Sequence, residues 1–199
     1  MEIVKKSDVL QPTMFGKILL ALPLVEELEN MDETNLAGAT SIANDISKLV
    51  EESRNLQITE TWLNDPYNQM LISYYRGLIL AAATRGGTDP ELARMEFEAA
   101  LRFVEAYPEV KPIKALTPMT HLHLAYLYLT HPGLDETGVL FKEQTANFIA
   151  RVGDMDRFDI LLTNAVTNPN SRGYIMFSNF AAESEEFRSF LQENYSVVF

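Results

Sequence analysis

The sequence predicts an all-α fold, built from antiparallel helical hairpins in a single domain that spans residues 1–199. Two observations support this prediction. Residues that begin and end helices recur along the chain, whereas strand patterns are nearly absent and only Val197–Phe199 looks extended. The chain is also long enough, with 47% hydrophobic residues, to bury a substantial core. No stretch has the composition of a linker between two domains.

Three helices are expected to begin at a capping residue followed by proline, at Asp65-Pro66, Asp89-Pro90 and Thr117-Pro118. The cap side chain accepts a hydrogen bond from a free backbone N–H, and proline at the first helical position loses no hydrogen bond. Glycine marks helix ends near residues 86, 133 and 153. The predicted helices span residues 12–30, 34–55, 66–85, 90–107, 118–131, 135–152, 155–167 and 172–194. Residues 111–116 are expected to form a loop.

The clearest helical pattern lies between residues 67 and 104. Ala93, Phe97 and Ala100 are spaced by four and three residues, which places them on one face of a helix. Gly77 is a small residue within the preceding apolar helix, and a turn at residues 86–87 separates the two segments. This arrangement predicts two antiparallel helices in close contact, with Phe97 wedged between them. Short connections between all eight helices favour stacked hairpins.

Gly77, Ala93, Phe97 and Ala100 resemble one repeat of the tetratricopeptide family, which implies a tetratricopeptide-like array. The turn is about four residues longer than in that family, and the final proline is displaced to Pro108. An ordinary helical hairpin is the alternative.

A second segment resembles the C-terminal end of the periplasmic repeat proteins that accompany tripartite ATP-independent transporters. The residues that carry this resemblance are Asp156, Phe158, Leu161, Leu162, Ala165, Asn179, Ala181, Leu191 and Phe199. It implies an all-helical body that binds partner proteins and holds a small ligand in a central pore or groove. Proteins of that family are commonly lipoproteins, whereas this chain has no cysteine to lipidate.

The composition argues against several classes of function. With 16 basic and 28 acidic residues, the net charge of −12 opposes binding to nucleic acid or to anionic membranes. The longest apolar run, Ile18–Val25, is too short to span a bilayer. The absence of cysteine excludes thiolate metal sites and cysteine nucleophiles. Localisation stays open between the cytoplasm and, if a leader was removed, the periplasm.

No motif predicts catalysis, a cofactor or a metal site. His121 and His123 lie two residues apart, so on a helix they point in different directions and cannot hold one ion together. His131 lies further along the same predicted helix. Neither a Gly-x-Ser-x-Gly elbow nor a glycine-rich phosphate loop is present. Clusters of glutamate, such as Glu183, Glu185 and Glu186, are interpreted as solvated helix faces.

Tyr74, His123 and Tyr126 are the candidate residues for binding a ligand or partner. Tyr74 lies three residues before Gly77, and Tyr126 follows Ala125, which could play the same role as Gly77. Tyrosine combines a large apolar face with a polar tip, which suits recognition surfaces. His123 would add a hydrogen bond that depends on pH. The alternative is that the tyrosines belong to the core.

The sequence therefore predicts a non-enzymatic binding or scaffold protein that recognises a partner protein or a small-molecule ligand on a concave helical surface. Two alternatives remain: a solute-uptake accessory of a tripartite transporter, and a structural subunit of a virion or secretion apparatus, for which homo-oligomers are expected.

Overall fold

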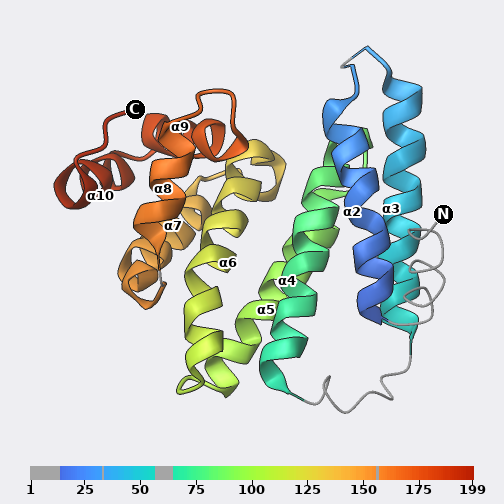
Figure 1. The fold of residues 1–199 in the computed structure, drawn as a ribbon, viewed down its shortest axis with the longest axis horizontal. Helices are drawn as coiled ribbons and strands as arrows, with labels where there is room; N and C mark the ends of the chain where they lie inside the picture. Colours follow the sequence, from blue (N-terminus) through green and yellow to red (C-terminus); the bar gives the residue numbers. More distant parts are fainter. Residues whose placement is uncertain (1–13, 33, 57–64, 156) are drawn as a thin grey trace. The chain divides into compact units, whose positions relative to one another are not determined.

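The computed structural model describes residues 14–32, 34–56, 65–155 and 157–199, and 83% of these residues are helical. The described part contains nine α-helices and no strand, which confirms the all-α prediction (Figure 1). The helices form two compact units, one within residues 1–107 and one within residues 108–199. The prediction of a single domain stays a prediction, and each unit is described by itself.

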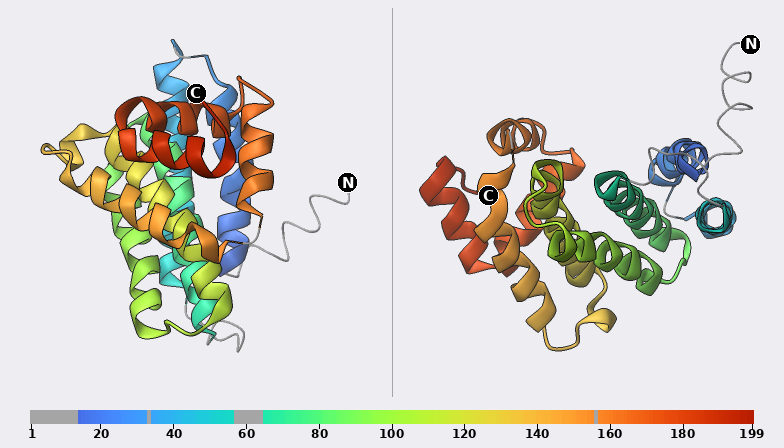
Figure 2. Two further views of the ribbon diagram at one scale, coloured as in Figure 1. Left: turned by 90° about the vertical axis from the view of Figure 1, so that its left-hand side faces the viewer. Right: turned by 90° about the horizontal axis from the view of Figure 1, so that it is seen from below.

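The first unit contains four described helices: α2 (Met14–Asn30), α3 (Leu36–Asn55), α4 (Pro66–Ala83) and α5 (Pro90–Ala106). Helix α2 packs along α3, and α4 packs along α5 (Figure 2). The predicted caps at Asp65 and Asp89 are confirmed, since their side chains accept hydrogen bonds from the backbone N–H groups of Tyr67 and Glu91 at 2.9 and 3.0 Å. Each proline occupies the first turn, as expected.

The contact between α4 and α5 depends on Gly77. A Cβ atom at this position would lie 2.7 Å from the ring of Phe97, closer than real side chains approach. Ala93, Phe97 and Ala100 are fully buried. The close approach of these two helices is therefore as the spacing predicts, while the relation to tetratricopeptide repeats stays a resemblance.

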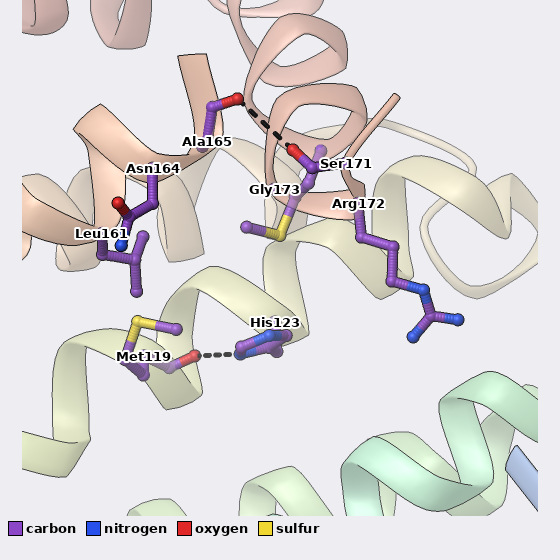
Figure 3. A pocket seen from close by; sticks show the side chains of 9 residues that line it. Met119, His123, Leu161, Asn164, Ala165, Ser171, Arg172 and Gly173 are labelled. Atoms are coloured by element: carbon purple, nitrogen blue, oxygen red, sulfur yellow. Dashed lines mark hydrogen bonds between the residues drawn. The ribbon is translucent and has the colours of Figure 1, made fainter. Parts of the chain in front are cut away.

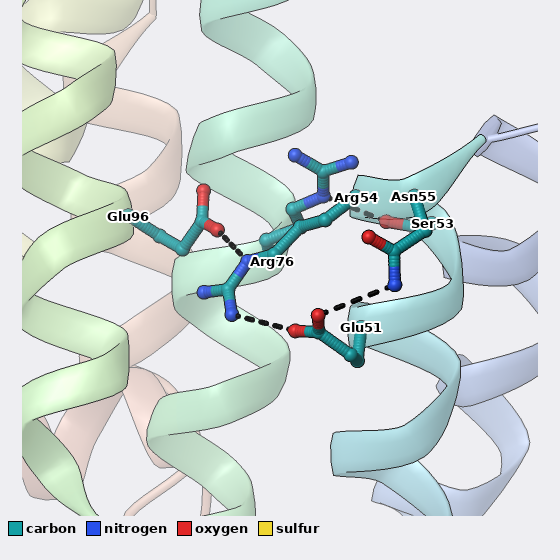
Figure 4. A network of polar contacts seen from close by, with 6 residues as sticks. All are labelled: Glu51, Ser53, Arg54, Asn55, Arg76 and Glu96. Atoms are coloured by element: carbon teal, nitrogen blue, oxygen red, sulfur yellow. Dashed lines mark hydrogen bonds and ion pairs between the residues drawn. The ribbon is translucent and has the colours of Figure 1, made fainter. Parts of the chain in front are cut away.

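A polar network links three helices of the first unit (Figure 4). Arg54 of α3 donates from Nε to Glu96 of α5 at 2.8 Å, and Arg76 of α4 donates from Nε to the Ser53 hydroxyl of α3 at 2.7 Å. Glu51 accepts a weaker bond from Arg54 at 3.3 Å. The Nη2 atom of Arg76 is buried without a hydrogen-bond partner, and burial lowers the pKa of this guanidinium. Arg54 thus pairs with two carboxylates and Arg76 with a neutral hydroxyl, and together these contacts tie α3 to α4 and α5.

The second unit contains the five helices α6 (Lys111–Thr130), α7 (Val139–Arg151), α8 (Phe158–Val166), α9 (Arg172–Glu183) and α10 (Glu185–Tyr195). Helix α6 packs on α7, α8 packs on α9, and α10 contacts both α7 and α9. Their shared core is aromatic. Its fully buried rings belong to Phe148, Phe177, Phe180 and Phe187.

Two predicted boundaries in this unit are wrong. Helix α6 begins at Lys111 rather than Pro118, because Pro112 also suits the first turn of a helix. Thr117 lies inside this helix, where its hydroxyl donates to the Ile113 carbonyl at 2.7 Å instead of capping a start. The predicted helix 172–194 is two helices, because Ser184 caps α10 by accepting from the Phe187 N–H at 3.1 Å.

Candidate functional site

The second unit has a pocket of about 340 Å³ between α6, α8 and α9 (Figure 3). Its walls are mainly apolar, and Leu161 and Asn164 of α8 face Met119 and His123 of α6 across it. Such a volume lies at the lower end of the range for small-molecule sites, roughly 300–1,000 Å³. The lining residues are Met119, His123, Leu161, Asn164, Ala165, Ser171, Arg172, Gly173 and Met176.

The turn between α8 and α9 fixes one side of the pocket. Ser171 caps α9 by accepting from the Tyr174 N–H at 3.1 Å, and its hydroxyl donates to the Ala165 carbonyl at 3.3 Å. A Cβ atom on Gly173 would lie 3.0 Å from the Cβ of Ala165, so the two helices approach closely here. One hydroxyl thus joins the last turn of α8 to the first turn of α9.

His123 is the predicted site residue that lines the pocket. Its Nδ1 atom lies 2.8 Å from the carbonyl oxygen of Met119, one turn earlier on α6. A carbonyl can only accept, so in the neutral ring Nδ1 carries the proton. Burial lowers the pKa of His123 further than this hydrogen bond raises it. The ring is therefore neutral at pH 7 and contributes shape and polarity rather than charge.

Tyr126 lies one turn after His123 on α6, but it is not among the residues that line the pocket. Its ring stacks on Phe180, with centroids 6.1 Å apart and planes inclined by 23°. The side chain is half-buried at the edge of the aromatic core. Whether Tyr126 also contacts a ligand stays a prediction.

Tyr74 does not lie at a surface. It belongs to the first unit, is 7% exposed, and packs against Phe97 and Tyr75 with ring centroids 6.2 and 5.7 Å apart. Burial raises the pKa of its hydroxyl. The expectation that Tyr74 borders a binding surface is therefore corrected. Helix α4 contacts α2 and α3 as well as α5, so a position angled away from Gly77 is buried too.

Sequence analysis did not single out Met119, Met176 or Arg172. One signal could have found Met119, since it precedes His123 by four residues and so shares a helix face with it. No comparable signal marks Met176 and Arg172, because their approach to α6 depends on how α8 and α9 fold back.

The other histidines make separate local contacts. His121 Nδ1 lies 2.7 Å from Gln144 Oε1 of α7, and burial lowers the pKa of this ring. His131 Nδ1 lies 3.2 Å from the Leu127 carbonyl at the end of α6. Within the part of the chain that the structure describes, no three or more His, Asp or Glu side chains gather where they could hold a metal ion. Likewise, none of the described helices is long and apolar enough to cross a membrane.

Comparisons with family models, curated proteins and solved structures returned no match for this chain.

Proposed function

We propose that this protein is a non-enzymatic binding protein, and that the pocket of its second unit holds a small, largely apolar ligand. The observation that carries this proposal is the pocket itself, to which three helices contribute apolar side chains. Met119 of α6, Leu161 of α8 and Met176 of α9 are the large apolar side chains among its lining residues. Methionine is flexible and polarisable, so such walls adapt to an apolar ligand.

Exposed large apolar residues occur in both units and do not by themselves define a protein-binding patch. Protein interfaces that use apolar contacts need a contiguous patch of several hundred Å². Among the described residues, the large hydrophobic side chains with high exposure belong to eight different segments. They are Leu22, Leu36, Met95, Tyr107, Val139, Ile160, Ile175 and Val198.

The polar residues of the lining support binding rather than catalysis. Nucleophilic catalysis needs a hydroxyl within hydrogen-bond reach of a base. Ser171 has the one hydroxyl among the lining residues, and it already bonds the Ala165 carbonyl and the Tyr174 N–H. His123 has its Nδ1 atom directed to the Met119 carbonyl. These groups hold the helices in place and give the pocket a few fixed polar points.

The uncharged fluorescent probe N-phenyl-1-naphthylamine tests this proposal. We expect saturable binding with enhanced fluorescence, and at least tenfold weaker binding to the variant Leu161→Gln. Burying a leucine side chain contributes about 1.5–3 kcal/mol, and a tenfold change corresponds to about 1.4 kcal/mol. Met119→Gln, which alters the opposite wall, should weaken binding in the same direction.

Ile160→Gln is the matched control, because Ile160 is the preceding residue of α8, is 48% exposed and does not line the pocket. It should bind the probe like the unmodified protein. The proposal fails if the probe shows no saturable binding, or if the Leu161 and Met119 variants bind it as tightly as the Ile160 control. Far-ultraviolet circular dichroism of each variant establishes that its helices are intact.

A further inference from the structure

The polar side chains that line the pocket differ in whether they already interact within the protein. Ser171 uses its hydroxyl to join α8 to α9, and His123 Nδ1 meets the Met119 carbonyl at 2.8 Å. Arg172 and His123 also interact with other groups of the protein. The remaining polar side chain is the carboxamide of Asn164, which makes no hydrogen bond within the part of the chain that the structure describes. A ligand can therefore engage this amide without breaking an existing contact.

Asn164 is placed where a ligand in the pocket would meet it. It follows Leu161 by three residues on α8, so the two side chains share a face of this helix. Met119 and His123 face them from α6 (Figure 3). Asn164 is exposed, which leaves its amide accessible. One wall of the pocket thus offers an apolar surface and a hydrogen-bonding amide side by side.

We propose that the ligand is a small uncharged molecule with an apolar body and a primary carboxamide or lactam head group, and that the head group pairs with Asn164. This inference rests on the proposed function, because it names the chemical class of ligand for the same pocket. The asparagine side chain presents a carbonyl acceptor beside N–H donors. A primary amide or a lactam presents the same groups in the complementary order, so two parallel hydrogen bonds can join it to Asn164.

The rest of the lining favours an uncharged head group. Met119, Leu161 and Met176 are apolar, and burial keeps the His123 ring neutral at pH 7. Moving a charge out of water against such side chains is costly, and an amide supplies no countercharge. A neutral amide that pairs with Asn164 keeps its hydrogen bonds, whereas one that meets only apolar walls loses the bonds that it made with water. Asn164 therefore determines which head group the pocket accepts.

The experiment displaces N-phenyl-1-naphthylamine with three ligands that share the octanoyl chain: octanamide, N,N-dimethyloctanamide and octanoate. We expect octanamide to displace the probe at the lowest concentration. The two methyl groups of N,N-dimethyloctanamide make it more apolar but remove both N–H donors, so hydrophobicity alone predicts the opposite order. Asn164→Leu should weaken octanamide about tenfold, equivalent to about 1.4 kcal/mol, and Asn164→Ala should act in the same direction. The probe itself should bind Asn164→Leu at least as tightly as the unmodified protein, because leucine extends the apolar wall.

Asn179→Leu is the matched control, because it makes the same change at an exposed residue of α9 that lies outside the lining. It should leave all three ligands unchanged. The inference is overturned if N,N-dimethyloctanamide or octanoate competes as well as octanamide, or if Asn164→Leu weakens octanamide no more than Asn179→Leu does. In these cases the probe still binds and the proposed function stands. Failure of the probe itself to bind would instead remove the proposed function.

Discussion

Replacing Gly77 with alanine tests the contact between α4 and α5. In an exposed helix, this change would stabilise the protein by about 1 kcal/mol, because alanine has the higher helix propensity. Here the added methyl group would lie 2.7 Å from the Cδ1 and Cε1 atoms of Phe97. Non-bonded carbon atoms prefer separations of about 3.5–4.0 Å.

The Phe97 ring is shielded from solvent, so it can yield to a new methyl group only within the packed core. It is fully buried, and so are Ala93 and Ala100 on the same face of α5. Overpacking a tight core typically costs about 1–3 kcal/mol, which exceeds the gain in helix propensity. We therefore expect Gly77→Ala to lower the free energy of unfolding by about 1–2 kcal/mol.

Urea unfolding followed by far-ultraviolet circular dichroism measures this change. Gly133→Ala is the matched control, since a Cβ atom there would meet nothing within 4 Å. It should be neutral or stabilise the protein by up to about 1 kcal/mol. Combining Gly77→Ala with Phe97→Leu should cost less than the two changes added together, because they share one contact. If Gly77→Ala is at least as stable as the unmodified protein, the close approach described here is refuted.

Three further substitutions test the electrostatics of the fold. Glu96→Gln should destabilise the protein by about 1–3 kcal/mol, because the 6% exposed Glu96 accepts from Arg54 at 2.8 Å. Glu98→Gln, two residues away in a more exposed pair with Arg94, should cost less than about 1 kcal/mol in the same urea assay, and equal effects would contradict this ranking. Asp135→Ala should cost about 1 kcal/mol at pH 7, since Asp135 accepts from the Phe141 N–H at 2.7 Å at the start of α7. Burial raises the pKa of Asp135, but backbone hydrogen bonds from Phe141 and Leu140 outweigh it and the net shift is downward. This stabilisation is therefore present above about pH 4 and is lost as the pH falls through the lower pKa of the folded state. The melting temperatures of protein and variant should converge in acid, and a constant difference would contradict the assignment.

Local chemistry explains which parts of the fold could be predicted from the sequence. Asp65 and Asp89 cap helices as expected, because the cap and the proline act within one turn. Thr117 is also followed by a proline, Pro118, but it lies inside α6, which begins beside Pro112. No local rule decides at which of the two prolines the helix begins. The choice depends on packing, since Ile113 and Thr117 are both buried in the folded unit.

The candidate site was predictable only in part, for the same reason. His123, which the sequence analysis named as a candidate binding residue, lines the pocket. Tyr74 was misplaced, because its spacing from Gly77 describes one neighbour of α4 and says nothing about α2 and α3. Arg172 and Met176 lie some fifty positions after His123, and a spacing rule cannot pair residues across that distance.

The close helix contact at Gly77 and the proposed ligand pocket lie in different compact units. The contact of Gly77 with Phe97 and the network around Arg54 and Arg76 belong to residues 1–107, whereas every residue that lines the pocket belongs to residues 108–199. Substitutions that share no partners have nearly additive effects. A change in the lining of the proposed pocket therefore needs no compensating change in the contact of Gly77 with Phe97. In related chains, the residues that line the pocket and the residues at the contact of Gly77 with Phe97 should vary independently of each other.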